Sequence, residues 1–204
     1  AGGISLVQKL KNRQSAPAQM TVEQTKYIEA SPDFTVELLT PNEYSRPQLA
    51  IDTVNGIVIH YTANPGTSAE QNRSYFESLA QTKETYASSN FVIGLEGEII
   101  QCIPCNEIAY ASNDRNNDTI SIECCIPDDS GKFTDATYES LTELTAWLMG
   151  RYDLTTEQVI RHYDVTGKNC PKYYVENPDA WTQFKEDLLT YIDTYGIEKK
   201  QEIN

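Results

Sequence analysis

The stretch Arg161-His162-Tyr163-Asp164-Val165-Thr166-Gly167-Lys168-Asn169-Cys170-Pro171 is the most informative part of this chain. It contains one of only two histidines in the 204 residues, and a cysteine follows that histidine eight positions later. The other histidine, His60, ends a run of apolar residues that favour β-structure, Ile57-Val58-Ile59. We interpret His60, His162 and Cys170 as three ligands of one zinc ion.

The chemistry of these three side chains supports the interpretation. A catalytic zinc site typically takes three protein ligands and leaves a fourth position for water or substrate. Two neutral imidazoles and one thiolate suit the borderline softness of zinc. The spacing between His162 and Cys170 is not diagnostic by itself, so an alternative remains in which the two histidines and the cysteine are unrelated.

Strand and helix patterns alternate around these residues. Strands are predicted at 56–62, 90–94, 98–103, 119–126 and 159–160, and helices from a cap at Thr67 or Ser68 to about residue 81, at 137–152 and at 178–195. Such alternation predicts an α/β fold with a central mixed sheet flanked by helices. In the strand at 119–126, Ile122 faces the core and Glu123 points to the opposite face.

Composition divides the chain into three parts. Residues 47–195 carry the periodic patterns and are predicted to be the main domain. Residues 1–46 are interrupted by prolines and form a loosely structured lead-in that wraps the domain, with a short apolar stripe at Ile4, Val7 and Leu10. Whether this lead-in is an extension, a linker remnant or part of a groove stays open. Residues 196–204 are predicted to be a short polar tail.

The net charge of −14 excludes several classes of partner. Nucleic acids and anionic membrane surfaces are recognised by clustered lysine and arginine, which this chain lacks.

No apolar run reaches the ~18–20 residues of a membrane-spanning helix. No signal peptide is visible, although the chain starts Ala1-Gly2-Gly3 without methionine, which makes this weak evidence about location. We expect a monomer.

Five cysteines exclude complete intramolecular pairing. Cys102 and Cys105 have the spacing of a redox pair or of half a zinc ribbon, but no second such pair completes a ribbon. Plain packing as small apolar side chains is the favoured interpretation. The neighbours Cys124 and Cys125 should point to opposite faces of a strand.

Six segments of the chain carry a family resemblance. They are Ile57 to Thr62, Asn72 to Phe76, Ser89 to Ile93, Gly97 to Gln101, Asn117 to Glu123 and His162 to Pro171. The most specific part is His-x-Asp-Val-Thr-Gly-Lys-x-Cys-Pro at 162–171. Together, over roughly residues 50 to 190, they resemble the zinc-dependent N-acetylmuramoyl-L-alanine amidases, the type-2 amidases that share a fold with peptidoglycan recognition proteins.

The resemblance implies a peptidoglycan-recognition-protein-like amidase fold. It implies hydrolysis of the amide between the lactyl group of N-acetylmuramic acid and the L-alanine of the stem peptide. His60, His162 and Cys170 fall on the zinc-ligand positions of the family. Glu123 falls on a catalytic glutamate position of many bacterial members, and Lys168 on a catalytic lysine position.

Two positions depart from the family pattern. Ser89 stands where recognition-protein relatives carry a catalytic tyrosine, and Asn90 stands where many bacterial relatives have a histidine. The resemblance therefore favours a route through Glu123. We expect Ser89, Asn90 and Tyr61 to be residues of the substrate groove.

Alternative functions remain open at this point. The chain could be a muropeptide-binding module without activity, or a zinc amidase that cleaves another peptidoglycan amide. A cell-wall substrate implies an extracellular or cell-wall location. A phage-type endolysin, a sporulation or germination amidase and a secreted autolysin are all compatible with the sequence.

Overall fold

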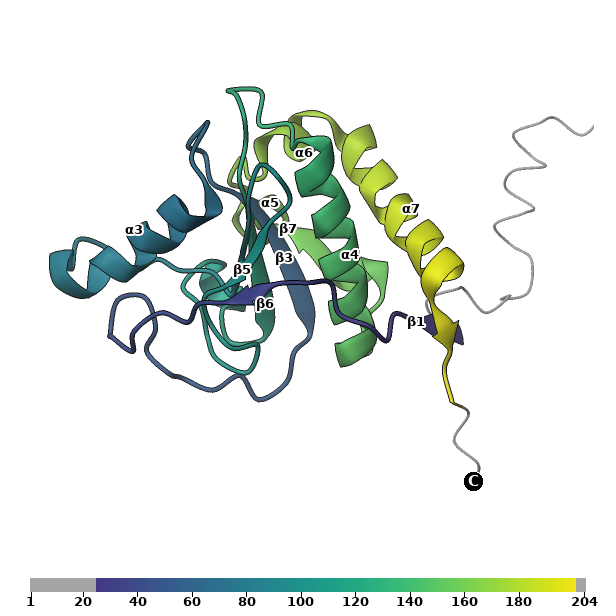
Figure 1. The fold of residues 1–204 in the computed structure, drawn as a ribbon, viewed down its shortest axis with the longest axis horizontal. Coiled ribbons are helices and arrows are strands. Elements are labelled where there is room, and N and C mark those ends of the chain that lie inside the picture. Colours follow the sequence, from purple (N-terminus) through teal and green to yellow (C-terminus); the bar gives the residue numbers. More distant parts are fainter. Residues whose placement is uncertain (1–24, 201–204) are drawn as a thin grey trace, which may run out of the picture.

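The centre of the computed structural model, which describes residues 25–200, is a six-stranded sheet in the order β2-β5-β4-β6-β3-β7 (Figure 1). The strands are β2 (Thr35–Val36), β3 (Gly56–Tyr61), β4 (Phe91–Ile93), β5 (Ile99–Gln101), β6 (Thr119–Cys124) and β7 (Val159–Arg161). β3 pairs in parallel with β6 and β7, and β6 pairs in parallel with β4. β4 and β5 form an antiparallel hairpin. The predicted mixed sheet is therefore confirmed.

Helices cover both faces of this sheet (Figure 1). α4 and α7 lie side by side on one face, and α3 lies on the other. The helices are α3 (Ala69–Thr82), α4 (Asp135–Tyr152), α5 (His162–Thr166), α6 (Lys172–Glu176) and α7 (Pro178–Tyr195), with 3-10 turns η1 (Asn113–Arg115) and η2 (Thr156–Gln158). The sequence prediction placed α7 at the same residues and started α4 two residues late. None of the helices among the described residues is long and apolar enough to cross a membrane.

The sheet separates two apolar clusters because successive side chains of a strand point to opposite faces. In β4, Phe91 and Ile93 belong to the larger cluster beneath α4 and α7. Val92, between them, belongs to the smaller cluster with Phe76 of α3. Each fully buried side chain of this size contributes roughly 1.5–3 kcal/mol relative to exposure. His60 and Glu123 follow Ile59 and Ile122 of the larger cluster, so their side chains face the α3 side of the sheet.

Helix α3 begins where the capping signals place it. The Ser68 side chain accepts a hydrogen bond from the Gln71 backbone, and the Gln71 side chain accepts one from the Ser68 backbone. This reciprocal pair satisfies two donors that the first turn of a helix leaves free. The cap fixes the start of α3, which covers the smaller cluster through Ala69 and Phe76.

The two ends of the described chain are more structured than the sequence predicted. β1 (Lys26–Tyr27) pairs antiparallel with β8 (Ile197–Glu198), so the predicted polar tail begins with a short strand. β2 adds the lead-in to the edge of the main sheet beside β5. Two-residue strands carry too little periodicity to be read from sequence. The predicted stripe at Ile4, Val7 and Leu10 lies outside the described residues.

The cysteines in the described chain are all free thiols. Cys124 belongs to the larger apolar cluster and Cys125 to the smaller one, which confirms that these neighbours face opposite ways. Cys102 is buried in the smaller cluster, while Cys105 is half-buried and packs against the larger one. Burial raises the pKa of Cys102 to about 12, as expected for a packed thiol.

Candidate metal centre and substrate pocket

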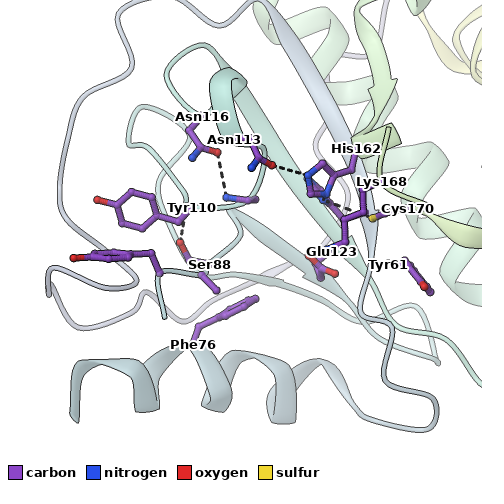
Figure 2. Close-up of a pocket in the computed structure, with 14 residues that line it drawn as sticks. Tyr61, Phe76, Ser88, Tyr110, Asn113, Asn116, Glu123, His162, Lys168 and Cys170 are labelled. Carbon is purple, nitrogen blue, oxygen red and sulfur yellow. Dashed lines mark hydrogen bonds between the residues drawn. The ribbon is translucent and has the colours of Figure 1, made fainter. Parts of the chain in front are cut away.

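The three predicted zinc ligands meet in one pocket of about 380 Å³ on the α3 side of the sheet. Such a volume lies within the ~300–1,000 Å³ typical of ligand sites. The lining residues are His60, Tyr61, Phe76, Tyr86, Ala87, Ser88, Tyr110, Ala111, Asn113, Asn116, Glu123, His162, Lys168 and Cys170. Figure 2 shows His162, Lys168, Cys170 and Glu123 together at one end, and Tyr110 at the other.

Two neighbouring parallel strands supply His60 and Glu123. The register pairs His60 of β3 with Glu123 of β6. Their sequence neighbours Ile59 and Ile122 are fully buried in the larger cluster, so alternation turns both polar side chains toward the pocket. A strand-borne pair of this kind is positioned by the sheet hydrogen bonds rather than by a loop.

The segment after β7 supplies His162 and Cys170. The Arg161 guanidinium donates to both oxygens of Asp164, at 3.1 and 2.8 Å, and to the backbone carbonyl of Tyr174 at 2.9 Å. The Tyr163 N–H donates to the Cys170 carbonyl at 2.9 Å, which closes the loop. α5 ends at Gly167 with φ of +82°, a conformation that favours glycine. These contacts hold the cysteine close to the histidine that begins α5.

The donor atoms of the three side chains converge. His60 Nδ1 and His162 Nδ1 are 3.2 Å apart, and Cys170 Sγ is 3.9 Å from His60 Nδ1. All three donor atoms lie within 4.8 Å of one another. Atoms about 2.0 Å from one tetrahedral ion lie roughly 3.3 Å apart, so this spacing suits a shared metal.

The outer nitrogens of both histidines are held by a neighbouring loop. His162 Nε2 lies 2.8 Å from Asn113 Oδ1, and His60 Nε2 lies 3.0 Å from Ser112 Oγ. Asn113 Oδ1 can only accept, so His162 Nε2 carries the proton and its Nδ1 presents a lone pair to the pocket. A proton on His60 Nε2 leaves a second lone pair facing the first. Two lone pairs and a sulfur around one point fit a divalent cation.

The electrostatics of the pocket keep the histidines neutral. Burial lowers the pKa of His60 well below its usual value, and the charges of His162 and Lys168 lower it further. Burial and then Lys168 lower the pKa of His162. Neutral imidazole is the form that binds metals. Burial, with Glu123 nearby, raises the pKa of Cys170 to about 12, and a bound cation would favour its thiolate.

Glu123 is a half-buried acid at the metal end of the pocket. Burial raises the pKa of its carboxyl to about 8, and the charge of Lys168 partly offsets that rise. A carboxyl with a pKa near neutrality can both accept and release a proton at physiological pH. Lys168 lies in the exposed loop between α5 and Cys170 and also lines the pocket.

Of the three predicted groove residues, the structure places only Tyr61 in the pocket lining. Ser89 and Asn90 are fully buried. Ser89 Oγ donates to the carbonyl of Phe91 at 2.8 Å, and Asn90 Oδ1 accepts from Ser121 N at 3.0 Å. Because Ser89 and Asn90 form these hydrogen bonds inside the protein, they connect the start of β4 to β6 and are not available to a ligand. The expectation for Ser89 and Asn90 is therefore corrected.

Sequence reasoning missed two groups of residues in and around the pocket. Ser112 and Asn113 hold the histidine rings, and nothing in their spacing indicates this. Tyr86, Tyr110 and Phe76 form an aromatic wall away from the histidines. A high tyrosine content was the one available signal, and it does not point to particular positions.

Comparisons with known proteins give a family match that spans these residues. A family model described as N-acetylmuramoyl-L-alanine amidase matches residues 51–173, more than half of the chain. That match contains His60, Glu123, His162, Lys168 and Cys170.

Individual relatives extend the likeness. The chain is 35% identical to the N-acetylmuramoyl-L-alanine amidase CwlL of Bacillus licheniformis over 78% of this chain and 47% of the relative. It is 33% identical to BlyA of Bacillus subtilis over 81% of this chain and 49% of the relative. The chain thus spans about half the length of these relatives. A mutant endolysin from Bacillus subtilis superposes with a TM-score of 0.65 at 25% identity, over 76% of this chain and 98% of that one.

Proposed function

Because this chain belongs to the N-acetylmuramoyl-L-alanine amidase family, we propose that it hydrolyses the amide between N-acetylmuramic acid and L-alanine in bacterial peptidoglycan. The observation that carries the proposal is the convergence of His60, His162 and Cys170 at the end of a pocket that also contains an acid and a lysine. The chain spans about half the length of the relatives it matches, so the proposal rests on the geometry of the site as well as on the similarity.

His60, His162 and Cys170 would hold a zinc ion. Two imidazole nitrogens and one sulfur are a donor set that zinc accepts readily, and three protein ligands leave a position for water or substrate. When bound, zinc supplies Lewis-acid chemistry that polarises the amide carbonyl and makes water acidic enough to attack at neutral pH. Ser112 and Asn113 keep the two rings oriented for this role.

Glu123 would act as the proton carrier of the reaction. It pairs with His60 across the sheet, and its side chain lines the same end of the pocket as the three donor residues (Figure 2). A carboxylate there accepts the proton of the attacking water and delivers it to the leaving amine of L-alanine. Amide cleavage needs this proton because the nitrogen would otherwise have to leave as an anion, whereas the protonated nitrogen leaves as the neutral amine.

Lys168 would stabilise the negative charge that develops on the carbonyl oxygen. Its side chain lines the same end of the pocket, and its positive charge lowers the pKa values of His60, His162 and Glu123, which supports this role. A cation already positioned where charge develops needs no reorganisation during the reaction.

The complete set of groups favours an enzyme over a binding module. A protein that only bound muropeptides would need neither a three-donor metal site nor an acid beside it. The substrate places the action at the cell wall or outside the cell, and the chain is expected to act as a monomer.

Digestion of purified peptidoglycan, followed by mass spectrometry of the products, tests the proposal. Free stem peptides with an amino-terminal L-alanine are expected, their release stopping on chelation and returning with added zinc. Intact peptidoglycan that binds the protein tightly would instead identify a recognition module. Cleavage at another amide would retain the zinc site and overturn the substrate bond.

A further inference from the structure

The end of the pocket away from the histidines is walled by tyrosines. Tyr110 lies at this end in Figure 2, and the ring of Tyr86 meets it at 5.5 Å with an interplanar angle of 73°. Tyr86 is 52% exposed although it lines the pocket. An aromatic ring this exposed inside a pocket offers an apolar face to a ligand.

The wall is held in place by the lead-in segment. The ring of Tyr44 stacks on Tyr86 at 4.8 Å and 20°, so one face of Tyr86 is covered. The Tyr86 hydroxyl donates to Glu43 at 3.1 Å, and the Ala87 N–H donates to the Tyr44 carbonyl at 3.2 Å. Tyr86 is therefore fixed before any ligand arrives, and a ligand that packs against its exposed part and the neighbouring Tyr110 loses little conformational entropy.

An oriented amide lies in the same part of the pocket. Asn116 Oδ1 accepts hydrogen bonds from the backbone N–H groups of Ala111 and Ser112, at 3.2 and 2.6 Å. This fixes which end of the amide is oxygen, and its NH₂ group has no hydrogen-bond partner among residues 25–200. Asn116 thus offers two donors to a ligand carbonyl beside the tyrosines.

The charge at this end suits a neutral ligand. Within residues 25–200, Lys168 is the only lysine or arginine of the pocket lining, and it lies at the histidine end (Figure 2). Glu43 is bonded to Tyr86 at the other end. Carboxylates of a stem peptide would be poorly placed against such a wall, whereas a sugar ring is uncharged and has an apolar face of C–H groups.

We propose that Tyr86, Tyr110 and Asn116 form a subsite for one N-acetylated sugar of the glycan strand, next to the muramoyl unit that carries the reacting amide. The pyranose ring stacks on the tyrosines, and its acetamido carbonyl accepts from Asn116. This inference rests on the proposed function for the placement of the muramoyl unit. The subsite predicts that the enzyme prefers stem peptides attached to a glycan strand over stem peptides attached to a single sugar.

Two soluble substrates with the same stem and the same scissile bond test the subsite. One carries N-acetylmuramic acid alone, and the other carries the disaccharide of N-acetylglucosamine and N-acetylmuramic acid. The measured quantity is the ratio of kcat/KM for the disaccharide substrate to kcat/KM for the single-sugar substrate. Replacement Tyr86→Ala should lower this ratio about tenfold through KM, the order expected for loss of one stacking ring.

Matched variants separate stacking from other effects. Tyr86→Phe keeps the ring and loses only the bond to Glu43, so it should retain most of the ratio. Tyr195→Ala removes a tyrosine that is 68% exposed outside the pocket and should leave the ratio unchanged. If Tyr86→Ala lowers kcat/KM equally for both substrates, or leaves the ratio as it was, the subsite is contradicted.

Binding of the free disaccharide, which has no stem and no scissile bond, distinguishes this inference from the proposed function. Calorimetry should detect binding to the unmodified protein and a roughly tenfold loss with Tyr86→Ala. Disaccharide binding through Tyr86 without cleavage of either substrate would support the subsite and overturn the amidase. Cleavage of both substrates without Tyr86-dependent binding of the disaccharide would support the amidase and contradict the subsite.

Discussion

The two ends of the pocket are built in different ways. At the histidine end, His60 and Glu123 stand on adjacent central strands whose other faces are fully buried. At the tyrosine end, Tyr86 and Tyr110 stand on loops; side chains from the lead-in hold Tyr86, which in turn contacts Tyr110. The first end is as rigid as the core of the sheet, whereas the second depends on a few loop contacts.

This difference suits the tasks proposed for the two ends. Bond cleavage requires donor atoms held to within a fraction of an ångström, and strands provide that precision. Recognition of a sugar tolerates small shifts, so it can be carried by loops that vary among relatives. Changes at the histidine end should therefore act on metal content and turnover, and changes at the tyrosine end on substrate preference.

The largest effect is expected for Cys170→Ala. Loss of the sulfur donor should remove the metal and lower turnover at least roughly a thousandfold, since the metal contributes several kcal/mol to the transition state. Metal analysis and peptidoglycan digestion check both parts. Cys105→Ala, which removes a half-buried thiol outside the pocket, is the matched control. A metal-free Cys170→Ala protein with full activity would contradict the metal centre.

Glu123→Gln should separate chemistry from metal binding. The amide keeps the shape of the side chain but cannot carry the proton, so turnover should fall at least roughly a hundredfold while metal content stays near that of the unmodified protein. Glu157→Gln, at an exposed position outside the pocket, controls for loss of charge. Unchanged turnover would remove Glu123 from the mechanism.

Much of the histidine end was predictable because its residues sit on regular elements. The alternation around Ile122 and Glu123 places the acid opposite the core, and the apolar run before His60 identifies a central strand. Ser89 and Asn90 were misplaced because their burial depends on hydrogen bonds to Ser121, which lies 32 and 31 residues away in the sequence. Hydrogen bonds between residues so far apart in the sequence cannot be predicted from the local pattern of apolar and polar residues.

The tyrosine end was not predictable for a related reason. Tyr44 and Tyr86 stack only because the lead-in passes beside the loop after α3. The sequence left the role of the lead-in open, and its described part contributes β2 and the support of Tyr86. Contacts between loops are set by tertiary packing, which neither propensity nor spacing encodes.

Ser112→Ala should have an intermediate effect at the histidine end. Removing the hydroxyl beside His60 Nε2 loosens one metal ligand without deleting it, so metal affinity should fall about 10–100-fold. Competition with a chelator of known affinity measures the change. Ser130→Ala, in an exposed turn, is the control. Unaltered affinity would show that Ser112 does not position His60.

Tyr44→Ala should have the smallest effect, and only on substrate preference. It uncovers one face of Tyr86 without removing the wall, so the preference for the disaccharide substrate should fall about two- to threefold. Metal content should stay the same, because Tyr44 lies outside the pocket lining. Loss of metal in this variant would show that the two ends are not independent.

X-ray absorption at the zinc edge of the purified protein tests the donor set most directly. His60, His162 and Cys170 predict two nitrogen neighbours at about 2.0–2.1 Å, one sulfur at about 2.3 Å and one further light atom from water. The sulfur signal should disappear, with the metal, in Cys170→Ala. A zinc site without sulfur in the unmodified protein would contradict the centre on which the proposed hydrolysis depends.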